Sequence, residues 1–263
     1  MSEINAKFIP NLDKFRVKVA LIAPTLSMES AMVFSPNFHL FLAHLVQSDK
    51  VYTDIALKSK GIKILDNSYF ELGYAVKGKE LVRLGRKIKA THLVLDDGSE
   101  EDLQLFKQNG FKVMYVPTNI EQLKSALYDK RFDKVGLGNL WSYKMTGLDK
   151  NSPYARFALL FKFYSEKPFD PNKVHLLGSN HGMADEVTAC YPYIGSWDSS
   201  VPIWSGLHGI VIKDRKYKWT EPVDFSANLL WSPECIQNIE YIEHLFTKRE
   251  ASIKQLKQEG VKQ

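Results

Sequence analysis

Cysteine is scarce in this sequence, and the two residues present, Cys190 and Cys235, lie far apart without CxxC spacing. This argues against a disulfide framework and against a cysteine-based zinc site, and it favours a reducing compartment. Long apolar runs are missing as well, because no stretch approaches the roughly 18 apolar residues that a membrane-spanning helix needs. The N-terminus also lacks the apolar run behind a basic start that marks a signal peptide. The sequence therefore predicts a cytoplasmic protein with no membrane segment.

A strong excess of either charge is absent too. The chain has 35 Lys and Arg against 30 Asp and Glu, a formal net charge of +5 and a pI of about 8.9. This mildly basic balance suits a polyanionic partner such as nucleic acid, although many cytosolic enzymes share it. The 263 residues, 44% of them apolar, are enough for a sizeable core. We therefore expect residues 1–263 to form one globular domain.

What the sequence does contain is an alternation of short, β-branched apolar runs with helical patterns. Such alternation is typical of parallel strands joined by crossover helices, and several runs are apolar throughout, as in strands covered on both faces. Strands are predicted at residues 17–24, 62–68, 91–98, 112–118, 134–139, 173–179, 193–200 and 209–214. Eight such units favour a single-domain (β/α)8 barrel. An open doubly wound sheet is the alternative, since periodicity alone does not close a sheet.

Helix boundaries are marked by local signals. Ser99, with Asp102 three residues later, predicts a capping box, and Asn119 predicts the N-cap of the next helix. A long last helix is predicted over about residues 233–258. The segment 25–61 is predicted to hold one helix, from Pro36 to Gln47, plus loops. We expect this segment to be an insertion after the first strand, of the kind that builds active sites.

Three of the predicted strands end in an aspartate, namely Asp66, Asp96 and Asp198. Catalysis in a β/α-barrel takes place at the C-terminal strand ends, so these carboxylates are expected to converge at the barrel mouth. Each one alone has an alternative meaning, because an aspartate after a strand is also a common turn former or helix N-cap. Converging carboxylates suit glycosyl transfer, in which one attacks the anomeric carbon and another transfers the proton of the base. Such chemistry requires neither a metal nor a redox cofactor.

Motifs at and after the strand ends follow one another along the chain. In LDNSYFE, Asp66 precedes small residues and then Phe70 and Glu71, and Asp96 ends the next predicted strand. GLGNLW (136–141) is a glycine-rich segment after a later strand.

The stretch VHLLGSNHGMADEVTACYPYIGSWDSSVP (174–202) is the most specific of these motifs. A strand ending in Gly178 leads through a short helix to a strand ending in Asp198, and Pro202 follows shortly after. Together, over roughly residues 66–202, the motifs resemble those of the tRNA-guanine transglycosylase superfamily.

The resemblance implies a barrel enzyme that flips a nucleotide out of its helix and exchanges a guanine-type base for a 7-deazaguanine such as preQ0 or preQ1. It implies that Asp198 is the nucleophile of a covalent glycosyl-enzyme. Asp66 would act as general acid toward the departing base and then as base toward the entering one. The residues expected to contact the base, by hydrogen bonds to its edge, by stacking or through the backbone, are Asp96, Asn67, Tyr69, Phe70, Gly136, Gly138, Asn139 and Gly178.

The sequence departs from this family in two ways. It lacks the zinc site of three cysteines and a histidine that follows the seventh strand of the tRNA enzymes. Asn67-Ser68-Tyr69 also replaces the usual Ser-Gly-Gly, which predicts a bulkier pocket lip. These features resemble the compact, phage-type DNA transglycosylases that handle 7-deazaguanine more than the tRNA enzymes. We therefore expect DNA rather than tRNA as the partner, and barrels of this family often form homodimers.

A basic segment with interleaved aromatic residues, KDRKYKW (213–219), follows the last predicted strand. It is a candidate for nucleic-acid phosphate contact, although a solvated charged loop is the commoner meaning of such a run. Its cations are Lys213, Arg215, Lys216 and Lys218. By strand alternation Trp197 is expected to point outward into the helix layer, whereas His175 is expected to face the core or the next helix, with no metal partner evident in the sequence.

Three other functions remain open on the sequence alone. The same carboxylates would serve a hydrolytic DNA glycosylase that releases a modified or damaged base to water. A catalytically inactive barrel could bind nucleic acid as an accessory subunit, although Asp66 and Asp198 are both present. An unrelated barrel could act on a small sugar or nucleoside and would ignore DNA.

Overall fold

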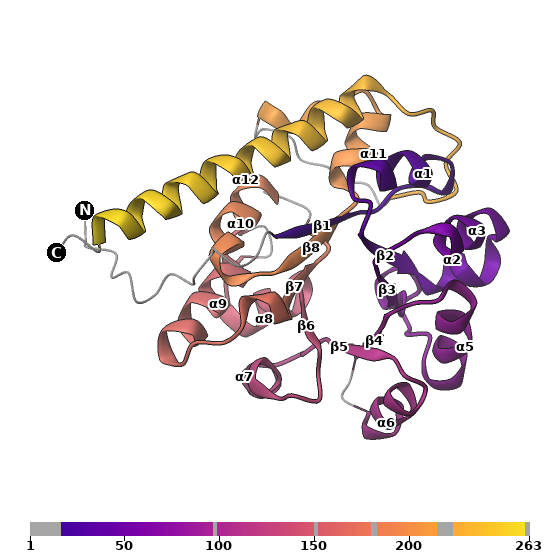
Figure 1. Cartoon of the computed structure of the whole chain (residues 1–263), viewed down its shortest axis with the longest axis horizontal. Helices are drawn as coiled ribbons and strands as arrows, with labels where there is room; N and C mark the ends of the chain where they lie inside the picture. Colours follow the sequence, from indigo (N-terminus) through magenta and orange to yellow (C-terminus); the bar gives the residue numbers. More distant parts are fainter. Residues whose placement is uncertain (1–16, 97–98, 150–151, 180–182, 215–222, 261–263) are drawn as a thin grey trace.

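Eight parallel strands form one sheet in this protein, whose computed structural model describes residues 17–96, 99–149, 152–179, 183–214 and 223–260. The sheet curls into a barrel, and the helices lie around its outside (Figure 1). The strands are β1 (Lys18–Leu21), β2 (Phe38–Leu42), β3 (Ile62–Asp66), β4 (His92–Leu95), β5 (Lys112–Tyr115), β6 (Lys134–Gly138), β7 (Val174–Leu177) and β8 (Ser196–Ser199). The predicted single-domain (β/α)8 barrel is confirmed.

Helices follow the strands along the chain. They are α1 (Thr25–Phe34), α2 (Ala43–Ser48), α3 (Lys50–Lys58), α4 (Tyr69–Leu72), α5 (Gly78–Ile88), α6 (Glu100–Gln108), α7 (Ile120–Tyr128), α8 (Asn139–Thr146), α9 (Ala155–Glu166), α10 (Met183–Cys190), α11 (Val201–Leu207) and α12 (Pro233–Gly260). Two of the predicted N-caps are confirmed. Ser99 Oγ accepts a hydrogen bond from Asp102 N at 3.2 Å, and Asn119 Oδ1 accepts one from Gln122 N at 2.9 Å.

The order of the strands in the sheet is their order in the chain. Each strand from β2 to β7 pairs in parallel with the strand that follows it in the chain, and β8 pairs in parallel with β1. β1 and β2 lie beside each other and nearly close the ring. At this seam the hydroxyl of Ser35 lies within hydrogen-bond reach of the carbonyls of Val19 and Phe38. A doubly wound open sheet has a different strand order, with a reversal in its middle, so that alternative is excluded.

The strands are buried on both faces, which explains their continuous apolar character. Ala20, Ile64 and Met114 belong to a cluster inside the barrel. Leu65 and Leu93 point the other way, into a larger cluster between the strands and the helices. Full burial of one such aliphatic side chain contributes about 1.5–3 kcal/mol. The barrel wall is therefore packed on both of its faces.

The last helix, α12, begins at Pro233 as predicted and lies across α10 and α11. It is the long yellow helix in Figure 1. Its Phe246 meets the outward-facing ring of Trp197 on β8 edge to face, with ring centroids 5.8 Å apart and an interplanar angle of 88°. The predicted outward orientation of Trp197 is therefore confirmed, and the helix covers the strand that carries Asp198.

Two strand predictions are wrong. The segment from Pro36 to Gln47 was expected to form a helix, but it contains β2 and only then α2. The segment 25–61 is consequently not an insertion: it is a regular part of the barrel, with α1, β2, α2 and α3. Residues 209–214 do not form a strand, since their regular structure is the short 3-10 helix η4 (Ile212–Asp214). The predicted second to seventh strands are therefore β3 to β8.

Candidate active site

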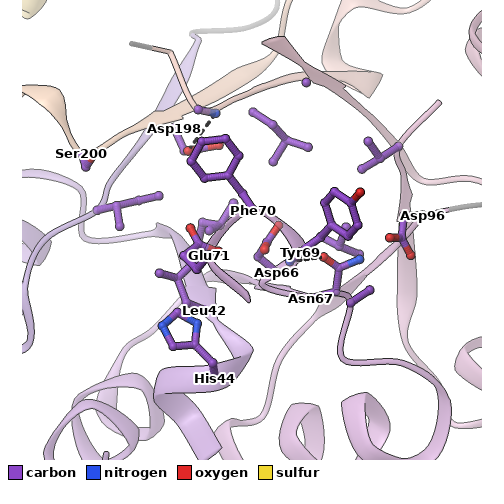
Figure 2. A pocket seen from close by; sticks show the side chains of 18 of the residues that line it. Leu42, His44, Asp66, Asn67, Tyr69, Phe70, Glu71, Asp96, Asp198 and Ser200 are labelled. Atoms are coloured by element: carbon purple, nitrogen blue, oxygen red, sulfur yellow. Dashed lines mark hydrogen bonds between the residues drawn. The ribbon is translucent and has the colours of Figure 1, made fainter. Parts of the chain in front are cut away.

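A cavity of about 1440 Å³ opens at the C-terminal ends of the strands. Figure 2 shows the labelled carboxylates of Asp66, Glu71, Asp96 and Asp198 around this cavity. The strands that carry them, β3, β4 and β8, are not all neighbours, so the barrel brings residues together that are far apart in the sequence. Of the residues predicted to form the site, the following line the cavity: Asp66, Asn67, Tyr69, Phe70, Asp96, Gly138, Asn139, Gly178 and Asp198.

Asp198 on β8 is only 3% exposed, and both oxygens of its carboxylate accept hydrogen bonds. His175 Nε2 lies 2.9 Å from Oδ1, and Gly178 N donates to Oδ2 at 3.1 Å. These two contacts leave the carboxylate little freedom to rotate. Asp198 is therefore held in a fixed orientation at the wall of the cavity.

Asp66 at the end of β3 has a different electrostatic environment. Burial, the negative charge of Glu71 and, more weakly, the charges of Asp198 and Asp96 raise the pKa of Asp66 to about 8. The hydrogen bond from Ser68 N to its Oδ1, at 2.7 Å, acts in the opposite direction. At neutral pH Asp66 therefore carries a proton in most molecules and can donate it.

Glu71 on α4 is a third carboxylate at the cavity, and its side chain is partly exposed. Its pKa is raised by burial first and by the charge of Asp198 second. The sequence motif contains Glu71, but only the structure places it among the site residues. Since its charge acts on Asp66, Glu71 is one of the groups that keep Asp66 protonated.

The turn after β3 sets the direction of the side chains at the mouth of the cavity. Ser68 adopts a left-handed conformation with φ of 59°, and its Oγ accepts a hydrogen bond from His44 N at 3.1 Å. Asn67 is buried, and its Oδ1 accepts a hydrogen bond from Tyr69 N at 3.1 Å. The side-chain amide hydrogens are therefore the group that Asn67 can offer to a ligand. The rings of Tyr69 and Phe70 are 44% and 83% exposed, and so can reach a ligand at the mouth.

Gly178 ends β7 with φ of +59°, a conformation that residues with a side chain rarely adopt. This conformation lets its N–H point at Asp198, while its carbonyl accepts a hydrogen bond from Asn139 Nδ2 at 2.9 Å. Asn139 therefore fixes the Gly178 residue, whose backbone N–H donates to the Asp198 carboxylate. Its Oδ1 is buried and has no hydrogen-bond partner among the described residues, so Asn139 can also accept a hydrogen bond from a bound base.

Gly136 and Gly138 differ in their position on β6. Gly138 lines the cavity, as predicted. Gly136 lies deeper, and a Cβ atom there would be 2.7 Å from Leu177 Cδ1 and 3.2 Å from Val116 Cγ2. Gly136 is therefore not among the residues that line the cavity, and its predicted approach to the base stays a prediction. Its role is to make room for the two side chains that form the cavity floor.

Two histidines near the carboxylates were not among the predicted site residues. His175 was expected in the core and is fully buried, but it also contacts Asp198. His44 on α2 lines the cavity, and burial lowers its pKa. Within the part of the chain that the structure describes, its buried Nδ1 has no hydrogen-bond partner. His44 was missed because it directly follows the unpredicted strand β2. Its place just after the end of β2 would have indicated that His44 lies at the barrel mouth.

The predicted phosphate-contacting cations are only partly described. Lys213 lies in η4, is exposed and does not line the cavity. Arg215, Lys216 and Lys218 lie outside the described residues. Across the ranges that the structure describes, no three His, Cys, Asp or Glu residues are grouped to hold a metal ion. No described helix is long and apolar enough to span a membrane.

Comparison with known proteins identifies the fold and no family. Neither a protein-family model nor a curated protein sequence matches this chain. Among solved structures, the thiamine phosphate pyrophosphorylase of Pyrococcus furiosus matches 89% of this chain and 96% of its own, with a TM-score of 0.50 and 10% identity. The YdjI aldolase of Escherichia coli K12 matches 96% of this chain and 92% of its own, with a TM-score of 0.47 and 12% identity. The chain is thus similar to TIM-barrel enzymes in fold alone.

Proposed function

We propose that this protein exchanges a purine-type base in DNA for a 7-deazaguanine, through a covalent intermediate on Asp198. One observation supports this proposal above the others. Asp66 and Asp198 line the same cavity, the surroundings of Asp66 favour its protonated form, and two hydrogen-bond donors hold the carboxylate of Asp198. A nucleophile and a general acid are the two groups that cleavage of an N-glycosidic bond needs.

In the first half of the reaction, an oxygen of Asp198 attacks C1′ of the target nucleotide. The bond between C1′ and the ring nitrogen of the base breaks, and its electron pair leaves with the base. Asp66 donates its proton to the departing base and becomes a carboxylate. The sugar is then held as an ester of Asp198, and the target must be flipped out of its helix for C1′ to reach this residue.

In the second half, the ring N–H of the entering base gives its proton to the Asp66 carboxylate. The ring nitrogen attacks C1′, and the ester bond to Asp198 breaks, with its electron pair returning to the carboxylate. The two hydrogen bonds to Asp198 stabilise the charge that is regenerated. Both acids are thereby restored without a cofactor.

The polar groups around the cavity suit the two sides of a planar base. Asp96 and the Asn67 amide can bind the Watson–Crick edge, and the Asn139 Oδ1 atom can accept a base N–H. Tyr69 and Phe70 at the lip can stack on an aromatic face. A flipped base is recognised in this way, by edge hydrogen bonds and by stacking.

The proposal is tested by incubating duplex DNA, and tRNA in parallel, with labelled guanine or a labelled 7-deazaguanine. We expect label in DNA, and a DNA–protein adduct that resists denaturation. Asp198→Asn should abolish both, whereas Asp54→Asn, which changes an exposed carboxylate on α3, should leave both unchanged. Abasic sites without incorporation would instead indicate a hydrolytic glycosylase. No reaction, with DNA binding retained, would indicate an inactive accessory barrel.

A second candidate is hydrolysis or transfer on a free nucleoside, and the charge of the cavity favours it. Among the described residues that line the cavity, five carry carboxylates and one, Lys77, carries an amine. The five are Asp66, Glu71, Asp96, Asp198 and Asp224. Such a lining repels phosphate, so a DNA substrate must be held by cations outside the cavity. Turnover of guanosine at the rate of DNA would support this candidate.

A further inference from the structure

Beneath Asp198, a row of buried polar side chains crosses the interior of the barrel. His175 on β7, Ser196 on β8 and Lys134 on β6 are each buried among the strands. His175 Nδ1 lies 2.9 Å from Ser196 Oγ, and Lys134 Nζ lies 3.2 Å from the same oxygen. Lys134 Nζ is also 3.1 Å from the carbonyl of Asn172. A barrel interior is ordinarily filled by apolar side chains, so this row is a costly arrangement that calls for a function.

The direction of each hydrogen bond follows from the donors that are present. The Lys134 ammonium group can only donate, so Ser196 Oγ accepts from it. Ser196 Oγ has two lone pairs, so this bond alone does not fix the tautomer of His175. The Asp198 carboxylate can only accept, so Nε2 carries the proton, and in a neutral ring Nδ1 then accepts the hydroxyl proton of Ser196. A neutral imidazole carries its one proton on the other nitrogen, so Nε2–H donates to Asp198 Oδ1.

The charged groups around His175 agree with a neutral ring. Its pKa is lowered by burial first, and Lys134 and Arg156 on α9 add to this, whereas Asp198 acts in the opposite direction. His92 on β4 is a second buried imidazole in the interior, and its pKa is also lowered. The ring of Phe38 on β2 covers another side, with centroids 5.9 Å apart.

We propose that His175, oriented by Ser196 and Lys134, is the positioning residue that keeps the carboxylate of Asp198 aimed into the cavity. The Nε2–H group holds one oxygen, and Gly178 N holds the other, so the carboxylate cannot rotate freely. The same donor stabilises the charge on Asp198 when the ester bond to the sugar breaks. The assignment of Asp198 as nucleophile belongs to the proposed function, whereas the orientation of His175 can be measured without any reaction.

The first experiment is NMR of the full chain labelled with 15N-histidine. We expect His175 as a neutral ring with its proton on Nε2, and Ser196→Ala should shift the Nδ1 signal, because it removes the donor at Nδ1, while Asp198 keeps the proton on Nε2. A proton on Nδ1, or on both nitrogens, near neutral pH would overturn the proposal. The wild-type spectrum decides this point even if a variant fails to fold.

The second experiment measures base exchange and the DNA–protein adduct. His175→Leu should lower kcat on the order of 100-fold, the usual cost of a misplaced reacting group, with little change in KM. His175→Gln, which keeps a side-chain N–H donor, should recover most of the loss. His92→Leu is the matched control, because it removes a buried interior imidazole whose recorded hydrogen bond is to Thr91 Oγ1, at 2.8 Å.

The two experiments separate two kinds of failure. If wild-type protein exchanges no base but His175 has the expected tautomer, the proposed function fails and the positioning of Asp198 stands. If exchange occurs but His175→Leu is as active as wild type, the positioning role is wrong. Equal losses in His175→Leu and His92→Leu would also contradict it, because both would then report a general packing defect.

Discussion

Asp66 and Asp198 are the same amino acid on the same cavity, and their surroundings differ. Two donors hold Asp198, at 2.9 and 3.1 Å. Asp66 has one backbone donor, and burial first and the neighbouring carboxylates second raise its pKa to about 8. Pairs of titratable groups whose surroundings separate their pKa values are a common basis for dividing acid and nucleophile roles.

The pH dependence of exchange should therefore show the proton on Asp66. Because the protonated form donates to the departing base, kcat should fall as the pH rises through about 8. Among the neighbouring carboxylates, Glu71 raises the pKa of Asp66 most. Glu71→Gln should therefore lower the pKa of Asp66 and move the fall in kcat to lower pH. Rates measured from pH 5 to 10 check the shift. Glu240→Gln, an exposed site on α12, is the control, and an unmoved profile in Glu71→Gln would contradict the assignment.

Asp66 should also reduce the stability of the fold at neutral and higher pH. The folded protein keeps the Asp66 proton up to about pH 8, whereas the unfolded chain loses it near pH 4, so this group's contribution to the free energy of unfolding falls across that window. Asp66→Asn has no proton to lose, so its free energy of unfolding does not fall in this way. We expect the variant to be inactive and more stable than wild type at pH 8 by about 0.5–2 kcal/mol, the usual range for relieving such strain. Urea unfolding at pH 4.5 and pH 8 checks this, and a gain of equal size at both would contradict it.

Most of the carboxylates could be predicted from the sequence, because an aspartate that ends an apolar run is visible as such. The histidines could not. His175 lies within β7, and its hydrogen bond to Asp198 depends on the register that pairs His175 with Ser196. A single sequence carries no register. Gly136 shows the converse, since its position in a glycine-rich segment does not tell whether it faces a ligand or makes room for Leu177.

At the scale of elements, the barrel was predictable and one of its strands was not. FHLFLAHLVQ has apolar residues at helical spacing, yet Phe38, Leu40 and Leu42 point into the barrel and Phe41 points into the helix layer. A strand that is apolar on both faces gives no alternation, so the local pattern does not separate it from a buried helix. The apolar run at residues 209–214 was counted in its place. The correct total of eight was reached with one strand wrong.

Arg156 on α9 connects β6, β7 and α10, beside the strand β8 that carries Asp198. Its guanidinium group is fully buried and donates to the carbonyl of Leu137 at 2.9 Å, to that of Leu177 at 2.7 Å and to Ser179 Oγ at 3.1 Å. Glu186 on α10 accepts the remaining donors, with one bond of 2.6 Å from Nε. All donors of this side chain are thus satisfied, which a buried charge requires.

Arg156→Met should therefore lower the free energy of unfolding by about 3–5 kcal/mol, since it leaves the buried Glu186 carboxylate unpaired. The double variant Arg156→Met, Glu186→Leu should recover part of this loss, but not all, because the carbonyls of Leu137 and Leu177 still lack a donor. Urea unfolding measures both. Lys50→Ala, which breaks an exposed pair with Asp54, is the control and should change little. A double variant less stable than the single one would contradict this account.

At the scale of the whole molecule, charge is divided between the cavity and the rest of the surface. The chain has a net charge of +5, yet among the charged described residues that line the cavity the carboxylates outnumber the cations. A flipped nucleotide brings at most its own phosphates to this mouth, so the flanking backbone must be bound by cations elsewhere. The basic segment 213–219 is the candidate that the sequence offers, and it follows α11 in the chain and begins within η4.

DNA binding should therefore weaken steeply with salt, and this dependence should come from that segment. Each phosphate contact contributes about 0.9 to the slope of log K against log salt, so replacing Lys213, Arg215, Lys216 and Lys218 with Gln should reduce the slope by up to about 3.6. Binding is measured by fluorescence anisotropy with the Asp198→Asn protein between 50 and 200 mM salt, at roughly the range where such slopes are large. The matched control changes four exposed cations that precede β3, β4 and β6, at the end of the barrel away from the cavity. They are Lys58, Lys60, Lys89 and Lys130. Equal slopes for the two quadruple variants would exclude the basic segment as the DNA-binding surface, while binding of a free base, which needs only the cavity, should be unchanged in both.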